Sequence, residues 1–168
     1  MIPQIKKILY ATDLSKNSAY AFYYAMDIAR NRDARIVILH AIEPVPPYLM
    51  AYEETLSKIQ QKNIEEATQE IKKRLNAFCE KVEGRLGVPC QDFVDEIIVR
   101  LGYPVEEILK TADEKECDLI VLGNHGKGFL LQTFLGSVSR SVLDRTRKPV
   151  FIIPLPPEES DIDWDKML

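Results

Sequence analysis

Four of the seven glycines in the chain stand between residues 123 and 136, directly after a short apolar run. Gly123 and Gly126 are separated by two residues, nine residues follow, and Gly136 then precedes Ser137 at the start of a helical pattern. Glycine lets the backbone bend sharply or approach a ligand closely, and a helix N-terminus carries unpaired N–H groups. A glycine turn beside a helix N-terminus can bind an anion such as a polyphosphate. The same spacing would also arise if the glycines served only as turn and helix-cap residues.

The glycine stretch matches neither of the two common phosphate-binding motifs. A P-loop requires lysine directly after its second glycine, and Phe129 stands there. A dinucleotide fingerprint could begin at Gly126 and Gly128, but Leu131 occupies the position of its third glycine. If the stretch binds phosphate, it does so in a different arrangement, to which the hydroxyl of Ser137 and the charge of Lys127 could contribute.

The rest of the chain alternates between strand and helix patterns. Continuous apolar runs predict strands at 6–13, 34–44, 93–102, 118–123 and 149–154, and helical spacing predicts helices at 15–33, 52–83, 104–116 and 137–146. This order implies an α/β domain with an open, mostly parallel sheet and helices on both faces. Ligands of such sheets bind at the carboxyl ends of the strands, where the strand order reverses. Thr12 and Asp13 follow the first predicted strand, and the glycines follow the fourth.

Composition and charge narrow the classes of partner. The 168 residues have the size of one ordinary domain, and we expect a domain at 1–154 followed by an acidic tail at 155–168. The net charge of −4 disfavours binding to nucleic acid or to an anionic membrane. Because no apolar run is long enough for a membrane span and none is typical of a signal peptide, we expect a cytoplasmic protein.

The glycine pattern, G-2x-G-9x-G-S after the segment DLIVLG, resembles the ATP-binding signature of the universal stress protein family. ILYATDLS, VILHAIEP and KPVFIIP resemble the first, second and last strands of that family, so the resemblance covers Lys6 to Pro154. It implies a Rossmann-like sheet of five strands in the order 3-2-1-4-5 and a homodimer formed through the last strand, 149–154. It also implies a regulatory protein that binds ATP, AMP or another adenine nucleotide, with Mg²⁺ bound at the phosphates.

The same resemblance assigns a nucleotide site by position. Asp13 would face the ribose or a bound metal, the backbone around Ala41 would lie beside adenine, and the glycine stretch would hold the ribose and phosphates. Alanine at position 41 replaces a valine common in the family, which implies a roomier adenine pocket. The full set of expected nucleotide-binding residues is Ala11, Thr12, Asp13, Ala41, Gly123, His125, Gly126, Lys127, Gly136, Ser137, Val138 and Ser139.

Two other functions are compatible with these residues. A slow nucleotide hydrolase would use Asp13 with a metal ion, assisted by His125, and a purely structural dimer would leave the site empty. Asp13 could also do no more than favour the start of the helix that follows it.

The remaining candidates for chemistry have simpler interpretations. His40 lies in an apolar strand and is expected to be a hydrogen-bonded core histidine. Cys79, Cys90 and Cys117 are odd in number and lack CxxC spacing, so neither a disulfide framework nor a zinc site is predicted. Cys117 precedes a buried strand and is expected to be a core thiol.

Overall fold

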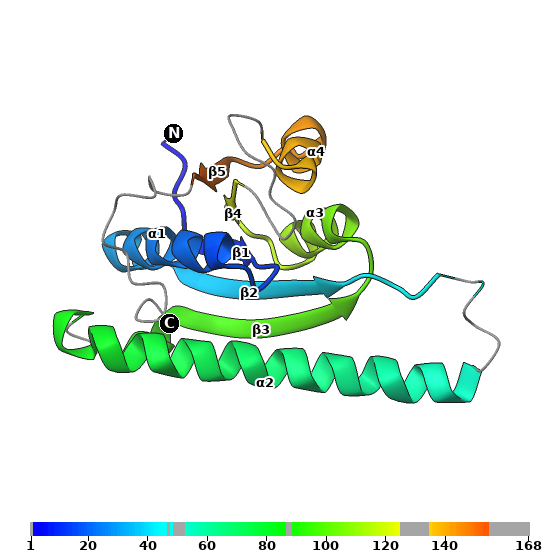
Figure 1. Ribbon diagram of the computed structural model, residues 1–168. Coiled ribbons are helices and arrows are strands. Elements are labelled where there is room, and N and C mark those ends of the chain that lie inside the picture. The colour runs from blue at the N-terminus through cyan, green and yellow to red at the C-terminus, as the bar shows by residue number, and fades with distance from the viewer. Residues whose placement is uncertain (1, 47, 49–52, 87–88, 125–134, 155–168) are drawn as a thin grey trace.

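Five parallel strands form one sheet in the order β3-β2-β1-β4-β5, with helices on both faces (Figure 1). The computed structural model describes residues 2–46, 48, 53–86, 89–124 and 135–154. In chain order the elements are β1 (Lys7–Ala11), α1 (Lys16–Arg32), β2 (Arg35–Ile42), α2 (Glu53–Leu86), η2 (Cys90–Phe93), β3 (Val94–Leu101), α3 (Pro104–Glu114), β4 (Leu119–Gly123), α4 (Ser137–Arg145) and β5 (Val150–Ile153). The predicted fold class and strand order are confirmed, and the short 3-10 helix η2 is an element that the sequence patterns did not predict.

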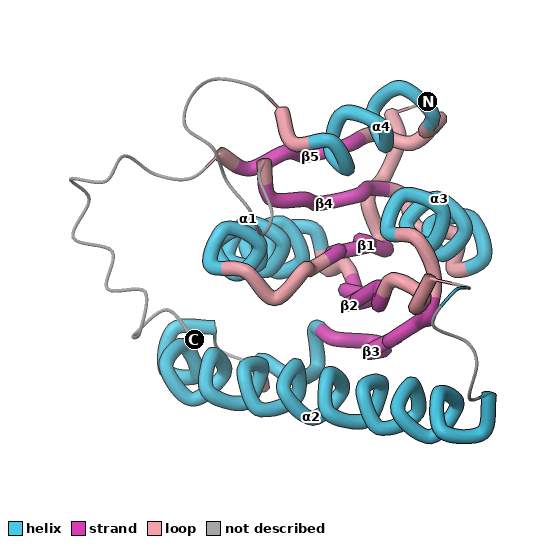
Figure 2. The backbone as a smooth tube through the Cα atoms, turned by 45° about the vertical axis from the view of Figure 1, so that its right-hand side comes forward, coloured by secondary structure: helices cyan, strands magenta, loops and turns pink. Residues whose placement is uncertain are grey.

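The central strand β1 is buried on both faces because two helical layers cover it. Ile8 and Tyr10 belong to the apolar cluster under α1 and α2, whereas Leu9 and Ala11 belong to the cluster under α3 and α4. Figure 2 shows α1 and α3 on opposite sides of β1. This double burial explains why β1 reads as a continuous apolar run instead of an alternating one.

Helix α1 begins at a side-chain cap and lies close to the sheet. The Ser15 hydroxyl accepts a hydrogen bond from the Ser18 backbone N–H, which confirms Ser15 as the N-cap. Ala21, Ala25 and Ala29 are completely buried and recur every four residues. Their small side chains allow this face of the helix to lie close to the strands.

Helix α2 packs on the sheet through only part of its length. Ile71, Leu75 and Phe78 are buried, whereas Ile59 in the first half of the helix is 45% exposed. Figure 1 shows α2 running along β3 and continuing past the end of the sheet. The predicted apolar stripe is therefore a sheet contact only in its later turns. Neither α2 nor any other described helix is both long and apolar enough to cross a membrane.

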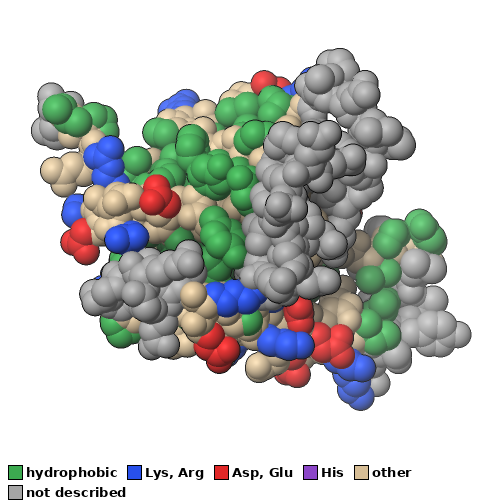
Figure 3. All heavy atoms as spheres, turned by 60° about the vertical axis from the view of Figure 1, so that its left-hand side comes forward, with side chains coloured by type: hydrophobic (Ala, Val, Ile, Leu, Met, Phe, Trp, Pro, Cys, Tyr) green, Lys and Arg blue, Asp and Glu red, His purple; other side chains and the backbone are tan. Residues whose placement is uncertain are grey.

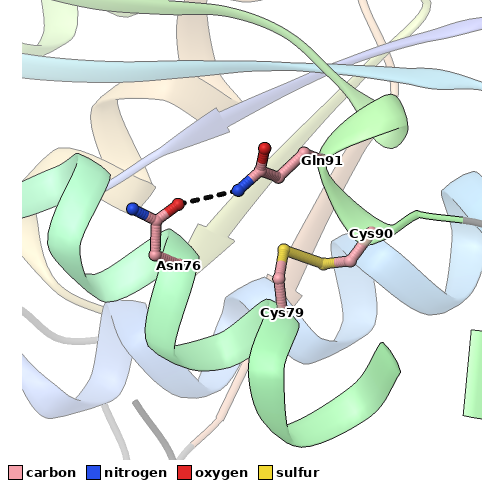
Figure 4. The surroundings of a disulfide bond; sticks show 4 residues. All are labelled: Asn76, Cys79, Cys90 and Gln91. Atoms are coloured by element: carbon pink, nitrogen blue, oxygen red, sulfur yellow. Dashed lines mark hydrogen bonds between the residues drawn. A yellow bond between two sulfur atoms is a disulfide. The ribbon is translucent and has the colours of Figure 1, made fainter. Parts of the chain in front are cut away.

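The end of α2 is linked to η2 by a disulfide between Cys79 and Cys90, which corrects the prediction that the cysteines form no disulfide (Figure 4). The amide of Gln91 donates a hydrogen bond to the amide oxygen of Asn76 at 2.8 Å and bridges the same two segments. The prediction failed because it tested short-range spacing, whereas this pair is 11 residues apart and meets only when the chain folds back. Cys117 is a free, buried cysteine, as predicted.

Candidate functional site

The candidate site lies at the carboxyl ends of β1 and β4, where the strand order reverses. From β1 the chain continues through α1 to β2 on one side, and β4 pairs with the other side of β1. A reversal of this kind leaves a crevice between the loops that follow the two strands. The fold thus brings Ala11, Thr12 and Asp13 to the same edge of the sheet as Gly123, with Ala41 on the adjacent strand.

The loop after β1 is a tight turn held by its own side chains. The Thr12 hydroxyl accepts a hydrogen bond from the Leu14 N–H at 3.0 Å, and the Asp13 carboxylate accepts one from the Ser15 N–H at 2.9 Å. Leu14 has a left-handed backbone with φ of 63°, which is uncommon for a residue with a side chain. Asp13 therefore does have the structural role at the helix start that its position suggested, and this role orients its carboxylate.

His40 fixes the carbonyl group at the beginning of this turn. Its Nδ1–H donates a hydrogen bond to the carbonyl oxygen of Thr12 at 2.7 Å, across from β2 to β1. The prediction of a hydrogen-bonded histidine is confirmed, although His40 is half-buried at the strand end instead of fully within the core. No local pattern in the sequence indicates that its partner is a residue of the candidate site.

Gly123 lacks a side chain because α1 occupies the space. A Cβ atom at this position would lie 3.1 Å from the carbonyl oxygen of Asn17 and 3.2 Å from its side-chain Cγ. The Cβ position of Gly123 faces the first turn of α1, so the close approach is between two segments of the protein.

Hydrogen bonds join the end of β4 to the start of α4. The Ser139 hydroxyl donates to the carbonyl oxygen of Gly123 at 2.9 Å, and the Gly136 N–H donates to the carbonyl oxygen of Asn124, also at 2.9 Å. Ser139 is buried, and the hydrogen bond from its hydroxyl links α4 to β4. These bonds close the two ends of the glycine stretch on each other and place the first turn of α4 beside the crevice.

The N-terminus of α4 has the properties of an anion-binding end. No described side chain caps it, and its first turn carries no acidic residue. Ser137 is exposed. Since the first N–H groups of a helix lack intrahelical partners and carry the positive end of its dipole, a phosphate group placed here would be stabilised.

The residue that follows β4 carries a buried hydrogen-bond acceptor. The side-chain oxygen Oδ1 of Asn124 is closed off from solvent and has no hydrogen-bond partner among the described residues. Such orphaned acceptors are uncommon in folded proteins and call for a donor such as a ligand hydroxyl or amino group or a water molecule. The sequence analysis did not identify Asn124, because an asparagine after a strand is most simply a turn residue.

His125, Gly126 and Lys127 lie outside the described residues. Within the described part of the chain, no group of three or more His, Cys, Asp and Glu side chains is arranged to hold a metal ion. Mg²⁺ bound with a nucleotide needs only one or two carboxylates because phosphate oxygens and water complete its shell, so Asp13 fits such an ion as a single protein ligand.

The free cysteine is unsuited to nucleophilic chemistry. Burial raises the pKa of the Cys117 thiol to about 11, so the reactive thiolate is scarce at neutral pH. Cys117 also lies before β4, at the opposite end of that strand from the site. It belongs to the apolar cluster under α3 and α4.

Known proteins match this chain over nearly its whole described length. The sequence profile of the universal stress protein family matches residues 4–154. A universal stress protein from Thermus aquaticus is 35% identical over 152 residues, which cover 88% of this chain and 98% of that protein. Universal stress protein MJ0577 from Methanocaldococcus jannaschii is 30% identical over 153 residues, covering 88% and 94%.

Solved structures show the same fold. The structure of MJ0577 superimposes with a TM-score of 0.72 at 28% identity, covering 92% of this chain and 99% of that one. A universal stress protein crystallised in complex with cAMP gives a TM-score of 0.56 at 23% identity, covering 92% of this chain and 100% of that one.

Proposed function

The chain belongs to the universal stress protein family, and on this basis we propose that it binds an adenine nucleotide at the carboxyl ends of β1 and β4. The observation that carries the proposal is the uncapped N-terminus of α4, held against the end of β4 by Ser139 and Gly136. The cAMP complex of a protein with this fold supports an adenine nucleotide as the ligand class. ATP is the first candidate because the glycine pattern resembles an ATP signature.

In this proposal each side of the crevice binds a different part of the nucleotide. The N–H groups of Ser137 and Val138 meet the phosphates, and Asp13 faces the ribose or a bound Mg²⁺. Ala41 lies beside the adenine. A bound Mg²⁺ would supply neutralising charge to the phosphates.

We propose that the protein is regulatory and that nucleotide occupancy changes the surface that it offers to a partner. We also propose that the protein is cytoplasmic, and cell fractionation checks this location.

Slow hydrolysis is the competing function. It predicts phosphate release from ATP that is lost in Asp13→Asn while nucleotide affinity is retained. A binding protein without turnover would show no such release above background.

The decisive experiment identifies the nucleotide directly. The purified protein is denatured, any released nucleotide is identified by mass, and the emptied and refolded protein is tested with ATP, AMP and cyclic AMP by thermal shift. We expect a released adenine nucleotide, or an increase in melting temperature with at least one of the three. The proposal fails if no nucleotide is released and none of the three raises the melting temperature.

An acidic residue at the start of α4 should separate binding from stability. Ser137→Glu places a negative charge beside the proposed phosphate position, and we expect nucleotide affinity to fall about tenfold, or ~1.4 kcal/mol. The same substitution should leave stability unchanged or slightly raised, because an acidic side chain is favourable at a helix N-terminus. Isothermal titration measures the affinity. Ser137→Gln is the matched neutral control, and equal affinities for the two variants would place the phosphates elsewhere.

We also propose that the protein forms a homodimer through β5. This strand is at the edge of the sheet, and Phe151 on it is 43% exposed, with its ring 6.2 Å from that of the exposed Tyr24 on α1. Figure 3 shows apolar side chains gathered on one face of the molecule. An unpaired apolar edge of this kind favours pairing with a second copy.

A charge on this edge should weaken the dimer. Phe151→Lys is expected to raise the dimer dissociation constant at least tenfold, as measured by sedimentation velocity. Tyr103→Lys is the control, since Tyr103 is also exposed but lies at the start of α3, away from β5. A monomeric wild type, or equal effects of the two variants, would contradict the proposed interface.

A further inference from the structure

The turn after β1 is contacted from a distant part of the chain. Helix α2 reaches it through Arg74, whose guanidinium Nη1 donates a hydrogen bond to the carbonyl oxygen of Leu14 at 3.0 Å. The two residues are 60 positions apart in the sequence. Leu14 is the residue with the left-handed backbone, directly after Asp13. A side chain of α2 thus binds the most strained residue of the candidate site's first loop.

The orientation of Arg74 is fixed on its own helix. Its Nε donates to the Glu70 carboxylate at 2.7 Å, and the two residues are four positions apart on α2. Because the guanidinium is planar, a hydrogen bond at Nε restricts the direction of the Nη groups. Glu70 therefore holds Arg74 in a rotamer that presents Nη1 to the loop. A lysine could supply the charge at this place but not the same geometry.

Leu14 packs against the apolar cluster that includes Ile71 and Leu75 of α2, but the loop and the helix leave a small pocket between them. This pocket of about 30 Å³ is lined by Thr12 and Leu14 from the loop and by Ile71 and Arg74 from α2. A space of this size can hold about one water molecule, so the packing between loop and helix is incomplete. The hydrogen bond from Arg74 adds a polar contact to the apolar packing of Leu14.

We propose that Arg74 is a positioning residue for the nucleotide site. Through Arg74, the position of α2 relative to the loop determines the nucleotide affinity. The ligand in this inference is the nucleotide of the proposed function, on which the inference therefore rests. Two distant groups hold the backbone on either side of Asp13: His40 holds the Thr12 carbonyl from β2, and Arg74 holds the Leu14 carbonyl from α2. Loss of the second contact frees the left-handed residue to relax and reorients the Asp13 carboxylate relative to the crevice.

The test compares three variants on α2. Arg74→Met keeps a long side chain but removes the donors, Arg74→Lys keeps one donor group and the charge, and Lys73→Met removes a positive charge from the adjacent exposed position. Amide hydrogen exchange of Leu14 and Ser15 is followed by NMR, and nucleotide affinity is measured by titration with ATP. We expect exchange at these two amides to accelerate about tenfold in Arg74→Met, less in Arg74→Lys and not in Lys73→Met. Affinity for ATP should fall about fivefold in Arg74→Met.

The outcomes distinguish this proposal from the proposed function. Unchanged exchange at Leu14 and Ser15 in Arg74→Met overturns the positioning role, whatever the protein binds. A general acceleration across the α1 amides would indicate a merely structural role and overturns it too. Local acceleration with unchanged ATP affinity overturns the link to affinity. Local acceleration in a protein whose wild type binds no nucleotide supports the positioning role and overturns only the proposed function.

Discussion

Removal of the Cys79–Cys90 disulfide should lower the free energy of unfolding by about 3 kcal/mol. The bond closes a short loop between two residues 11 apart, and the chain-entropy estimate for a loop of this length gives roughly that value. For a chain of this size the corresponding decrease in melting temperature is about 6–12 °C. The measurement is thermal unfolding with and without a reductant, and with Cys79→Ala/Cys90→Ala in place of reduction.

The third cysteine provides the control for this prediction. Cys117 is buried and free, so Cys117→Ala should leave the response to reductant intact. The double variant should lose that response, because it has no bond to reduce. A wild type whose melting temperature is the same with and without reductant would show that the bond contributes no stability. Because α2 also packs through Phe78, whose ring meets those of Phe22 and Tyr23 with centroids 5.0 and 4.9 Å away, we expect the reduced protein to remain folded.

The fold was predictable from local patterns because it depends on them directly. The apolar run at Ile8–Ala11 predicted a doubly buried strand, Ser15 predicted the start of α1, and Pro104 predicted the first turn of α3. Each of these features depends on neighbours in the sequence. The strand order 3-2-1-4-5 came from the family resemblance, since alternation of strands and helices does not by itself determine the order.

The contacts that shape the candidate site could not be predicted in the same way. His40 with Thr12, Arg74 with Leu14, and Asn17 with Gly123 are pairs whose members come from different elements. Nothing in the local sequence of either member indicates the other, because each pair depends on how complete elements pack. The described motif residues Thr12, Asp13 and Gly123 lie at one edge of the sheet, but the groups that orient them were not predicted.

Alanine substitution of two glycines should show that stability depends more on which atoms the added Cβ meets than on how close those atoms are. At Gly123 the added Cβ meets the backbone of Asn17 at 3.1 Å, in the first turn of α1. At Gly102 it would be closer to its neighbour, the side chain of Glu107, with Cγ at 2.7 Å. The Glu107 side chain can rotate away into solvent at the cost of its ion pair with Arg100, whereas the backbone of α1 can move only with the helix.

We therefore expect Gly123→Ala to destabilise the protein by about 2 kcal/mol and Gly102→Ala by less than about 1 kcal/mol. Gly123→Ala should also weaken nucleotide binding, because a displaced first turn of α1 carries with it the cap at Ser15 and the carboxylate of Asp13. Chemical denaturation gives the stabilities, and titration with ATP gives the affinities. A larger loss for Gly102→Ala would mean that α1 yields more easily than the Glu107 side chain. In that case the site would be built on a movable helix instead of a fixed one, and nucleotide binding itself could shift α1.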